Sequence, residues 1–445
     1  MSILKSIVEK AELFSAQDTS RSVDIRAGII GISYYEDILS PTITAKVHVV
    51  NASGAIKPFD DAGTYSQSIY NGLPLRGGEK LELKISGNSV SNPGLDFSLK
   101  AEDSLYVSSI SDVMSETKRE VFTLNLVSKE ALMNETNRVK LRYTGNIRDS
   151  VNTILTNVLK TDKFNFGNFD EVKNSYDFIG NNKKPFWVIT WLASKCISTI
   201  ANESAGFVFF QTKDGFRFKS LDKLIKKKPK ATYYYSEVSL AYDNDERKIN
   251  NDRKILTYSV DRNQNLIEKL RMGAYSSERY YFNPLTFESV KIGYDENLYK
   301  ETVKHLGSPE LDLPVIEGLE KPLGQSPSRV ISAVLDVGAK DAASEDVNND
   351  QANYQSQKLM RYNTLFIQTL SITVSSNTNL RAGDVIECMF PRISDSKAVE
   401  FDTETSGLYM IKELCHYFDT KGSYTSMKLV RDTFGINKEA RDDND

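Results

Sequence analysis

The sequence has few of the residues that mark secreted, metal-binding or membrane-spanning proteins. Its three cysteines, Cys196, Cys388 and Cys415, are too few for a disulfide framework or a cysteine-rich zinc site, and they fit a reducing compartment. No stretch approaches the roughly 18 consecutive apolar residues of a membrane-spanning helix, and the first 20 residues alternate charged with apolar side chains instead of forming a signal sequence. We therefore expect a protein that is made and kept in a cytosol-like compartment, without direct membrane insertion.

An excess of charge of one sign is also missing. The chain has 56 lysines and arginines against 60 aspartates and glutamates, a formal net charge of −4. This balance argues against a protein whose main task is to grip nucleic acid or an anionic membrane. The composition, 40% hydrophobic and 26% charged, excludes disordered and fibrous classes, and the 445 residues give room for roughly three domains.

The common catalytic motifs are absent as well. The sequence contains no HExxH, GxSxG or GxxxxGKS/T pattern, so nothing indicates a metalloprotease, a hydrolase nucleophile or a P-loop. The three histidines, His48, His305 and His416, are interpreted as structural residues, and Cys415 and His416 would face opposite sides of a strand. We predict no catalytic residue, no cofactor and no metal site, and hence no enzyme.

The first third of the chain predicts short β-strands. β-Branched and aromatic residues recur with partial alternation, and clusters of Gly, Asn and Pro separate the runs. The runs lie at 22–35, 42–53, 81–85, 104–110 and 120–128. They favour an antiparallel barrel or sandwich. Before them, Ile3 to Phe14 has the apolar spacing of a short amphipathic helix.

The middle of the chain predicts a small α+β unit. Apolar residues recur at helical spacing after Asn146 and again from Pro185 to Cys196. Asp214-Gly215 between two aromatic runs is a strong hairpin signal. The basic run Lys226 to Lys230 precedes Tyr233 to Tyr235, and we interpret it as a solvated linker rather than a nucleic-acid site.

A region of linker-like composition follows this unit. Residues 307–358 are rich in Pro, Gly, Asp, Asn and Ser, which predicts a long linker or excursion with a short apolar segment around 330–337. From Tyr362 to Phe434 the pattern is again that of β-strands.

An internal repeat connects the first and last thirds. LRGGEKLELKI, which starts at Leu75, matches LRAGDVIECMF, which starts at Leu380, at a separation of 305 residues. In each copy a glycine that tolerates positive φ precedes an acidic residue and an alternating strand, the chemistry of a tight turn. The turn residues that this repeat identifies are Gly77, Gly78, Glu79, Gly383 and Asp384.

Two further matches follow the same order along the chain. Leu105-Tyr106-Val107 matches Leu408-Tyr409-Met410, and the residues around Leu126 match those around Leu429, both at a separation of 303 residues. Upstream, ITAKVHVV (43–50) resembles IQTLSITV (367–374). Convergence on common turn chemistry would explain one match, but three in order favour an internal duplication that gives two similar antiparallel β-barrels.

With this repeat, the sequence resembles the baseplate central hub proteins of contractile-tailed bacteriophages, whose fold is related to the hub part of type VI secretion spike proteins. The resemblance covers most of the chain. It rests on the two barrels, on the helix NKKPFWVITWLASKCI (182–197) before a DG hairpin, and on the ending SGLYMIKELCHYFDTKGSYTSMKLVRDTFG (406–435). It implies a structural virion protein and a homotrimer, in which two barrels per chain make six similar units that adapt a sixfold tail tube to a threefold spike.

The resemblance also implies partners and a location. The trimer would contact the central spike or hub-lysozyme protein, the tail tube protein and the baseplate wedge proteins. It would belong to the tail baseplate of a virion assembled in the host cytoplasm. DNA would pass transiently through its lumen without specific recognition, because strong phosphate contacts would retard it.

The predicted fold class is mainly β with an α+β insertion and two tail-tube-like barrels. Its parts, in order, are a first barrel (1–145), an α+β domain with two helices and a hairpin (146–230), a mixed β segment with an insertion and a long linker (231–360), the main part of the second barrel (361–435) and a polar tail (436–445). The mixed segment could contribute strands to the second barrel.

Two alternatives stay open. One is the hub of a type VI-like injection machine, which differs from a phage hub in host context more than in physics. The other is a carbohydrate-binding or carbohydrate-active β protein, for which Tyr233 to Tyr235 and Tyr280-Tyr281 would supply aromatic contacts.

Overall fold

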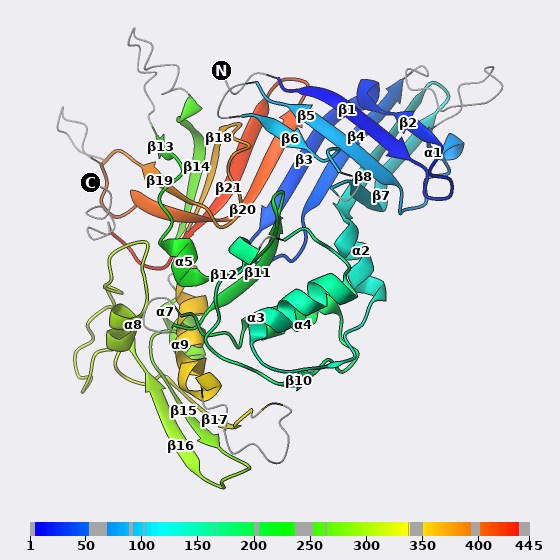
Figure 1. Cartoon of the computed structure of the whole chain (residues 1–445). Coiled ribbons are helices and arrows are strands. Elements are labelled where there is room, and N and C mark those ends of the chain that lie inside the picture. Colours follow the sequence, from blue (N-terminus) through cyan, green and yellow to red (C-terminus); the bar gives the residue numbers. More distant parts are fainter. Residues whose placement is uncertain are drawn as a thin grey trace.

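A single 14-stranded sheet dominates the computed structural model (Figure 1). The structure describes residues 5–52, 69–88, 92–100, 103–164, 166–199, 204–235, 252–262, 265–336, 338, 350–392 and 401–435. The predicted polar tail, 436–445, lies outside these residues. No helix in the described part of the chain is long and apolar enough to cross a bilayer.

The first half of the sheet holds eight strands and one core. The strands are β1 (Ile7–Phe14), β2 (Ser22–Asp24), β3 (Ile29–Asp37), β4 (Thr44–Ala52), β5 (Lys80–Ser86), β6 (Gly94–Asp96), β7 (Leu105–Glu116) and β8 (Arg119–Ser128). They pair antiparallel in the order β3-β4-β8-β7-β5-β1-β2, with β6 on β5. A 3₁₀ turn, η1 (Arg26–Gly28), and the short helix α1 (Ile69–Gly72) complete this half, whose inward-facing apolar residues form one cluster.

The N-terminal segment is a strand and not the predicted amphipathic helix. β1 pairs with β5 over its whole length. Ala11 and Leu13 are buried at every second position, whereas Ile7 is 65% exposed. The segment therefore follows the two-residue periodicity of a strand and not the helical spacing, because it forms backbone hydrogen bonds with β5.

The second half of the sheet repeats the arrangement of the first. Its strands are β13 (Thr232–Tyr234), β14 (Ile255–Arg262), β18 (Gln368–Ser375), β19 (Val385–Met389), β20 (Gly407–Asp419) and β21 (Ser423–Arg431). Their order is β14-β18-β21-β20-β19-β13, and only the β13–β19 pair is parallel. Their inward-facing side chains form a separate hydrophobic cluster.

The two halves are joined edge to edge by backbone hydrogen bonds. β20 pairs antiparallel with β3, from Glu413 opposite Asp37 to Asp419 opposite Gly31. The two units that the sequence predicted are therefore two parts of one continuous sheet. In Figure 1 the blue strands of the first half lie next to the orange and red strands of the second half in the same sheet.

A helical unit lies below the first half of the sheet in Figure 1. It comprises α2 (Lys129–Thr136), β9 (Arg142–Tyr143), α3 (Ile147–Thr153) with a π-helical continuation η2 (Ile154–Val158), η3 (Phe166–Asn168), β10 (Phe178–Ile179), α4 (Pro185–Ala193), β11 (Phe207–Thr212), β12 (Gly215–Ser220) and α5 (Leu221–Ile225). Both predicted helices and the predicted hairpin are confirmed. Asn146 caps α3 by accepting from the Arg148 N–H, and Pro185 begins α4.

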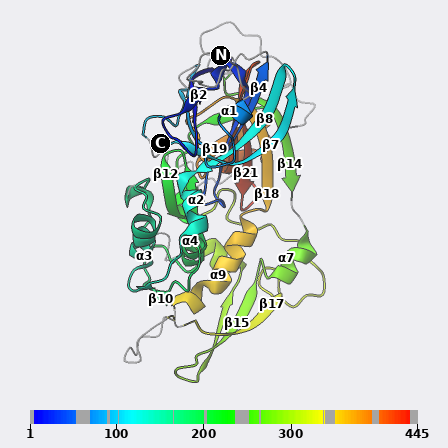
Figure 2. The same cartoon turned by 90° about the vertical axis from the view of Figure 1, so that its right-hand side faces the viewer.

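The region predicted as a long linker contains regular structure. It follows α7 (Leu266–Met272), β15 (Ser277–Phe282), β16 (Ser289–Tyr294) and α8 (Glu296–Thr302), and it holds β17 (Arg329–Val334) and the start of α9 (Asp350–Thr364). β17 pairs parallel with β15. The predicted return to β structure at Tyr362 is wrong by a few residues, because α9 continues to Thr364. Figure 2 shows α9 between the large sheet and the β15–β17 sheet.

Candidate functional site: two repeat turns and a buried junction

The two repeat turns have the same backbone hydrogen bonds. The Gly78 N–H donates to the carbonyl of Val107 (2.7 Å), and the Val107 N–H returns a bond to the carbonyl of Glu79 (2.9 Å). In the second copy, the Gly383 N–H donates to Ile411 (2.8 Å), whose N–H donates to Asp384 (2.8 Å). Each turn thus fixes the start of one strand against its neighbour in the same way.

The acidic residue of each turn caps the backbone of its own loop. The Glu79 carboxylate accepts from the Arg76 N–H (2.7 Å) and from the Gly77 N–H (3.0 Å). Asp384 accepts from the Arg381 N–H (3.0 Å). Gly77, Gly78 and Gly383 have φ values of +99°, +91° and +78°, which explains why glycine occupies these positions.

The pairing register corrects the predicted alignment of the next strands by one residue. Lys80 lies opposite Tyr106, and the equivalent Val385 lies opposite Met410. Tyr106 is therefore equivalent to Met410 and not to Tyr409. A β-bulge follows Val107 in the first copy and Ile411 in the second, at the same place. The Leu-Tyr pair at 105–106 and 408–409 is a coincidence of sequence. Aligning these residues would place side chains from opposite faces of the strand at equivalent positions.

The strand that begins the repeat needs the same correction. The partners in β8 and β21 make Ala45 equivalent to Leu370, one position from the predicted match. Both side chains are buried in the cores of their own halves. Shared strand order, turns and bulge support an internal duplication, which remains a prediction.

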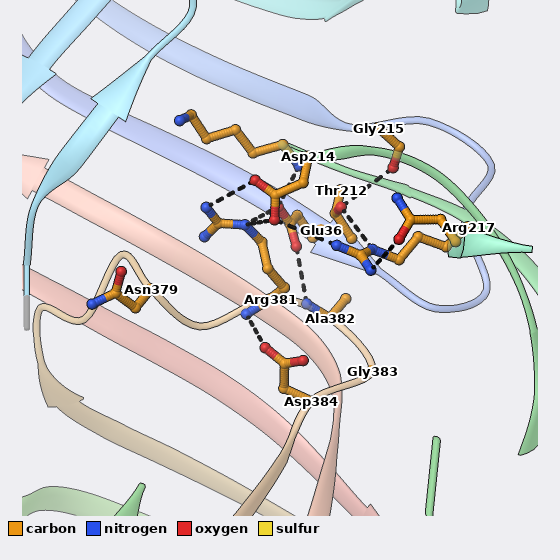
Figure 3. Close-up of polar contacts among 12 residues, drawn as sticks. Glu36, Thr212, Asp214, Gly215, Arg217, Asn379, Arg381, Ala382, Gly383 and Asp384 are labelled. Carbon is orange, nitrogen blue, oxygen red and sulfur yellow. Dashed lines mark hydrogen bonds and ion pairs between the residues drawn. The ribbon is translucent and has the colours of Figure 1, made fainter. Parts of the chain in front are cut away.

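The second turn differs from the first because it lies at a junction of three parts of the chain (Figure 3). Glu36 of β3 is buried, and its carboxylate accepts from the Ala382 N–H of the turn (2.9 Å) and from the Lys213 N–H of the β11–β12 hairpin (2.8 Å). Arg381 donates to Asp214 at the tip of the same hairpin (3.0 Å) and lies 3.9 Å from Glu36. One buried carboxylate thereby ties both sheet halves to the helical unit.

The charges at this junction compensate one another. Burial raises the pKa of Glu36 above its usual value, although the charge of Arg381 and the hydrogen bonds oppose that effect. At Asp214 burial acts in the same direction but is outweighed by Arg381, so the pKa of Asp214 is lowered. Tyr34 donates to Glu36 (2.8 Å), and burial raises the pKa of Tyr34 well above its usual value.

The basic run is part of this junction and not the solvated linker that we predicted. Lys227 donates to the carbonyl of Gly383 (2.8 Å) and pairs with Asp384 (3.2 Å), and Lys230 pairs with the same carboxylate (2.6 Å). Burial lowers the pKa of Lys227, while Asp384 opposes this change. Asp384, unlike Glu79, forms ion pairs with two lysines, and these pairs fix the basic run to the second turn.

The other residues that the sequence singled out lie apart from the junction or have structural partners. His305 contacts Asp432 (2.8 Å), and His416 contacts Thr425 (3.0 Å). Burial raises the pKa of Cys196 well above its usual value and that of Cys415 to about 11, so these thiols stay protonated. No group of three or more potential metal ligands occurs among the described residues.

Sequence reasoning missed Glu36 and Asp214 as partners of the second turn. The available signal was the alternation of β3, in which Ile32, Tyr34 and Glu36 occupy one buried face. A carboxylate on such a face requires donors. The resulting geometry is two like β units held in a fixed orientation by a polar junction.

Comparisons with known proteins agree with this architecture. No family model and no curated protein matches the chain. Among solved structures, the tail protein from Neisseria meningitidis MC58 matches with a TM-score of 0.53 and 11% identity over 95% of this chain and 96% of that chain. The 43 kDa tail protein of prophage MuSo2 from Shewanella oneidensis matches with a TM-score of 0.50 and 8% identity over 95% and 98% of the two chains.

The chain therefore has the fold of these tail proteins. The fold that its sequence resemblance implied, that of a phage tail protein, is confirmed. At identities of 8% to 11% the likeness concerns the fold alone.

Proposed function

We propose that this protein is a structural component of a phage tail, the trimeric central hub of the baseplate. The observation that carries the proposal is the pair of like β units fused through β20 and β3. Three copies would present six similar units around one axis, so the ring could meet a sixfold tube on one side and a threefold spike on the other.

The remaining roles follow from that position. The partners would be a central spike or hub-lysozyme protein, the tail tube protein and baseplate wedge proteins, in a virion assembled in the host cytoplasm. The hub would be non-enzymatic. DNA would cross its lumen without tight binding, which the net charge of −4 supports because a basic channel would hold phosphates.

The alternatives differ in how much support they retain. A hub of a type VI-like injection machine would use the same architecture. The carbohydrate alternative keeps fewer aromatic contacts than the sequence suggested, because Tyr233 is buried against Asn377 and Tyr281 is buried in its sheet, whereas Tyr234 and Tyr280 are exposed.

The test is the solution mass by light scattering of the purified 50.1 kDa chain, alone and mixed with the candidate spike protein. We expect about three times the subunit mass in at least one condition. A chain that stays monomeric and binds no spike would contradict the proposal. A parallel glycan-binding and hydrolysis screen decides the carbohydrate alternative, for which saturable binding or turnover would count.

A further inference from the structure

The pairing of β3 with β20, which we call the seam, occupies one edge of β20. The other edge of β20 pairs with β21 as far as Phe418. On the seam edge, β19 pairs with β20 through Met410, and β3 pairs with it from Glu413 onward, after the bulge that follows Ile411. The part of β20 beyond this bulge therefore has a neighbouring strand on both edges.

β7 is the equivalent of β20 in the first half, but one of its edges is open. β5 pairs with β7 only at the first two residues of β7, before the bulge that follows Val107. Beyond that bulge, β8 pairs with one edge as far as Glu116, and no strand in the described part of the chain pairs with the other edge. Val113 and Met114 on this stretch are 46% and 57% exposed. An open strand edge with apolar side chains is a template for a further strand.

β14 is the equivalent of β3 in the second half, and its outer edge is open as well. Tyr34 of β3 and Val260 of β14 lie opposite equivalent residues of β4 and β18. A bulge follows Ile29 in β3 and Ile255 in β14, at the same place in the two strands. β14 is the last strand of the sheet, and apart from a bridge of the preceding Lys254, its outer edge has no partner strand among the described residues. Figure 1 shows β14 on the left of the sheet and β7 on the right.

The seam also fixes the register that an equivalent contact would have. Tyr417 of β20 lies opposite Ser33 of β3. Met114 is the equivalent of Tyr417, because their partners in β8 and β21 are equivalent, and Ser259 is the equivalent of Ser33 for the same reason in β18 and β4. A second bulge between Ser111 and Met114 is specific to β7, so the register beyond it follows from the β8 partners and not from residue counting. Met114 of one chain would therefore lie opposite Ser259 of another.

The open edge of β14 leaves an aromatic side chain partly uncovered. Phe418 lies opposite Ile32 in the seam, and both are buried in the core of the first half. Their equivalents are Ser115 in β7 and Tyr258 in β14. Tyr258 is 43% exposed, although its ring centroid lies 4.9 Å from that of Phe390 in the second core. A β7 strand from another copy would cover Tyr258 as β20 covers Ile32.

We propose that β7 of one copy of this chain pairs antiparallel with β14 of the next copy, in the register of the seam. The two open edges are the equivalents of the two strands that already pair within the chain, so the contact continues an interface that the fold contains. Each copy would supply one edge of each kind, so the contact is head-to-tail and can close a ring of identical chains. This inference rests on the proposed homotrimer and gives it a specific contact.

The first experiment tests the register by disulfide formation in the full chain. Met114→Cys with Ser259→Cys places the two thiols at opposite ends of one sheet, so only a contact between copies can join them. Opposite residues of antiparallel strands have Cα atoms about 4.5–5.5 Å apart, which suits a disulfide. Mild oxidation should give covalent multimers on a non-reducing gel. Met114→Cys with Val260→Cys, one residue out of register and on the other face, is the matched control and should give about tenfold less.

A second pair of variants measures association without a cross-link. Met114→Lys with Ser259→Lys places like charges opposite each other only across the proposed contact, and should weaken self-association in sedimentation velocity by about fivefold or more. Met114→Glu with Ser259→Lys places opposite charges at the same two positions and should recover most of that loss. Both positions are exposed in the single chain, so circular dichroism spectra and melting temperatures should match the wild type.

The outcomes separate this contact from the hub proposal. Both experiments use the sample in which the chain forms a trimer, alone or with the spike protein, and the single cysteine variants show the background from the native thiols. A trimer whose in-register cysteines cross-link no better than the shifted pair, or which the lysine pair leaves intact, overturns the contact but keeps the hub. A chain that is monomeric in both conditions contradicts the hub and the contact together.

Discussion

The two repeat turns share the same backbone hydrogen bonds but differ in their surroundings. In the first, Arg76 and Gly78 are exposed, and Glu79 uses its carboxylate on its own loop. In the second, every residue from Leu380 to Asp384 is buried, and the arginine and acid reach other parts of the chain. The same local turn therefore serves as a simple strand connection in one half and as the centre of a junction in the other.

The largest expected difference between the turns is at their arginines. Arg381→Met leaves the Glu36 carboxylate buried without its cation and should lower the free energy of unfolding by about 3 kcal/mol, whereas Arg76→Met should change it by less than about 0.5 kcal/mol. Urea unfolding followed by circular dichroism measures both. Adding Glu36→Gln to Arg381→Met should recover part of the loss, and equal effects at the two arginines would refute the comparison.

The glycines should differ less. Gly78→Ala and Gly383→Ala both place a side chain at positive φ, at a cost of about 1–2 kcal/mol. At Gly383 the new Cβ would also lie 3.0 Å from Phe210 Cζ and 3.3 Å from Leu224, whereas at Gly78 the nearest atom is the Ala16 Cβ at 3.7 Å. We expect Gly383→Ala to cost about 1 kcal/mol more, measured by the same unfolding experiment. A larger loss at Gly78 would contradict this crowding argument.

The buried His416, whose charged form the nearby Arg381 disfavours, should make stability depend on pH. Burial and then the nearby Arg381 lower the pKa of His416 to about 3, so the folded chain does not bind this proton where the unfolded chain, with a pKa near 6.5, does. Protonation then favours unfolding, and stability should fall by about 1.4 kcal/mol per unit as the pH drops from 6.5 toward 3. His416→Gln should reduce that slope, and His48→Gln in the first half is the matched control. An unchanged slope in His416→Gln would be inconsistent with the assignment.

The smallest effect is expected at the surface of the second turn. The Lys230 side chain is nearly half exposed, so Lys230→Met should cost at most about 0.5 kcal/mol. Lys227→Met should cost about 1 kcal/mol, because this less exposed ammonium also donates to the Gly383 carbonyl. Thermal melts in low and high salt measure both, and only the Lys230 contribution should fade with salt. The reverse order would indicate that Asp384 depends on the outer lysine.

Local chemistry explains which parts of the fold could be predicted from the sequence. The repeat turns, the Asp214-Gly215 hairpin and the helix that begins at Pro185 each depend on neighbouring residues, so their signals are present in short stretches. The register of β20 is different. Leu408-Tyr409 looks like Leu105-Tyr106, but pairing with β19 and β21 shifts the equivalence by one residue.

Long-range pairing explains the rest. β3 and β20 are separated by most of the chain, and the sequence of neither strand indicates that they pair. The segment of β1 was predicted as a helix because its apolar residues also fit helical spacing, whereas its partners β5 and β2 lie outside the segment. The basic run was predicted as a solvated linker because its partner, Asp384, lies more than 150 residues away in the sequence.

The backbone pairing of β3 with β20 has a consequence for the kinetics of assembly. Two β units on separate chains must meet by diffusion and lose translational and rotational freedom, a cost of several kcal/mol for each association. In this chain that encounter is intramolecular, so its equilibrium does not depend on protein concentration. A ring of six such units built from three chains would need two bimolecular encounters, and three of its six seams would be complete before the first two molecules collide.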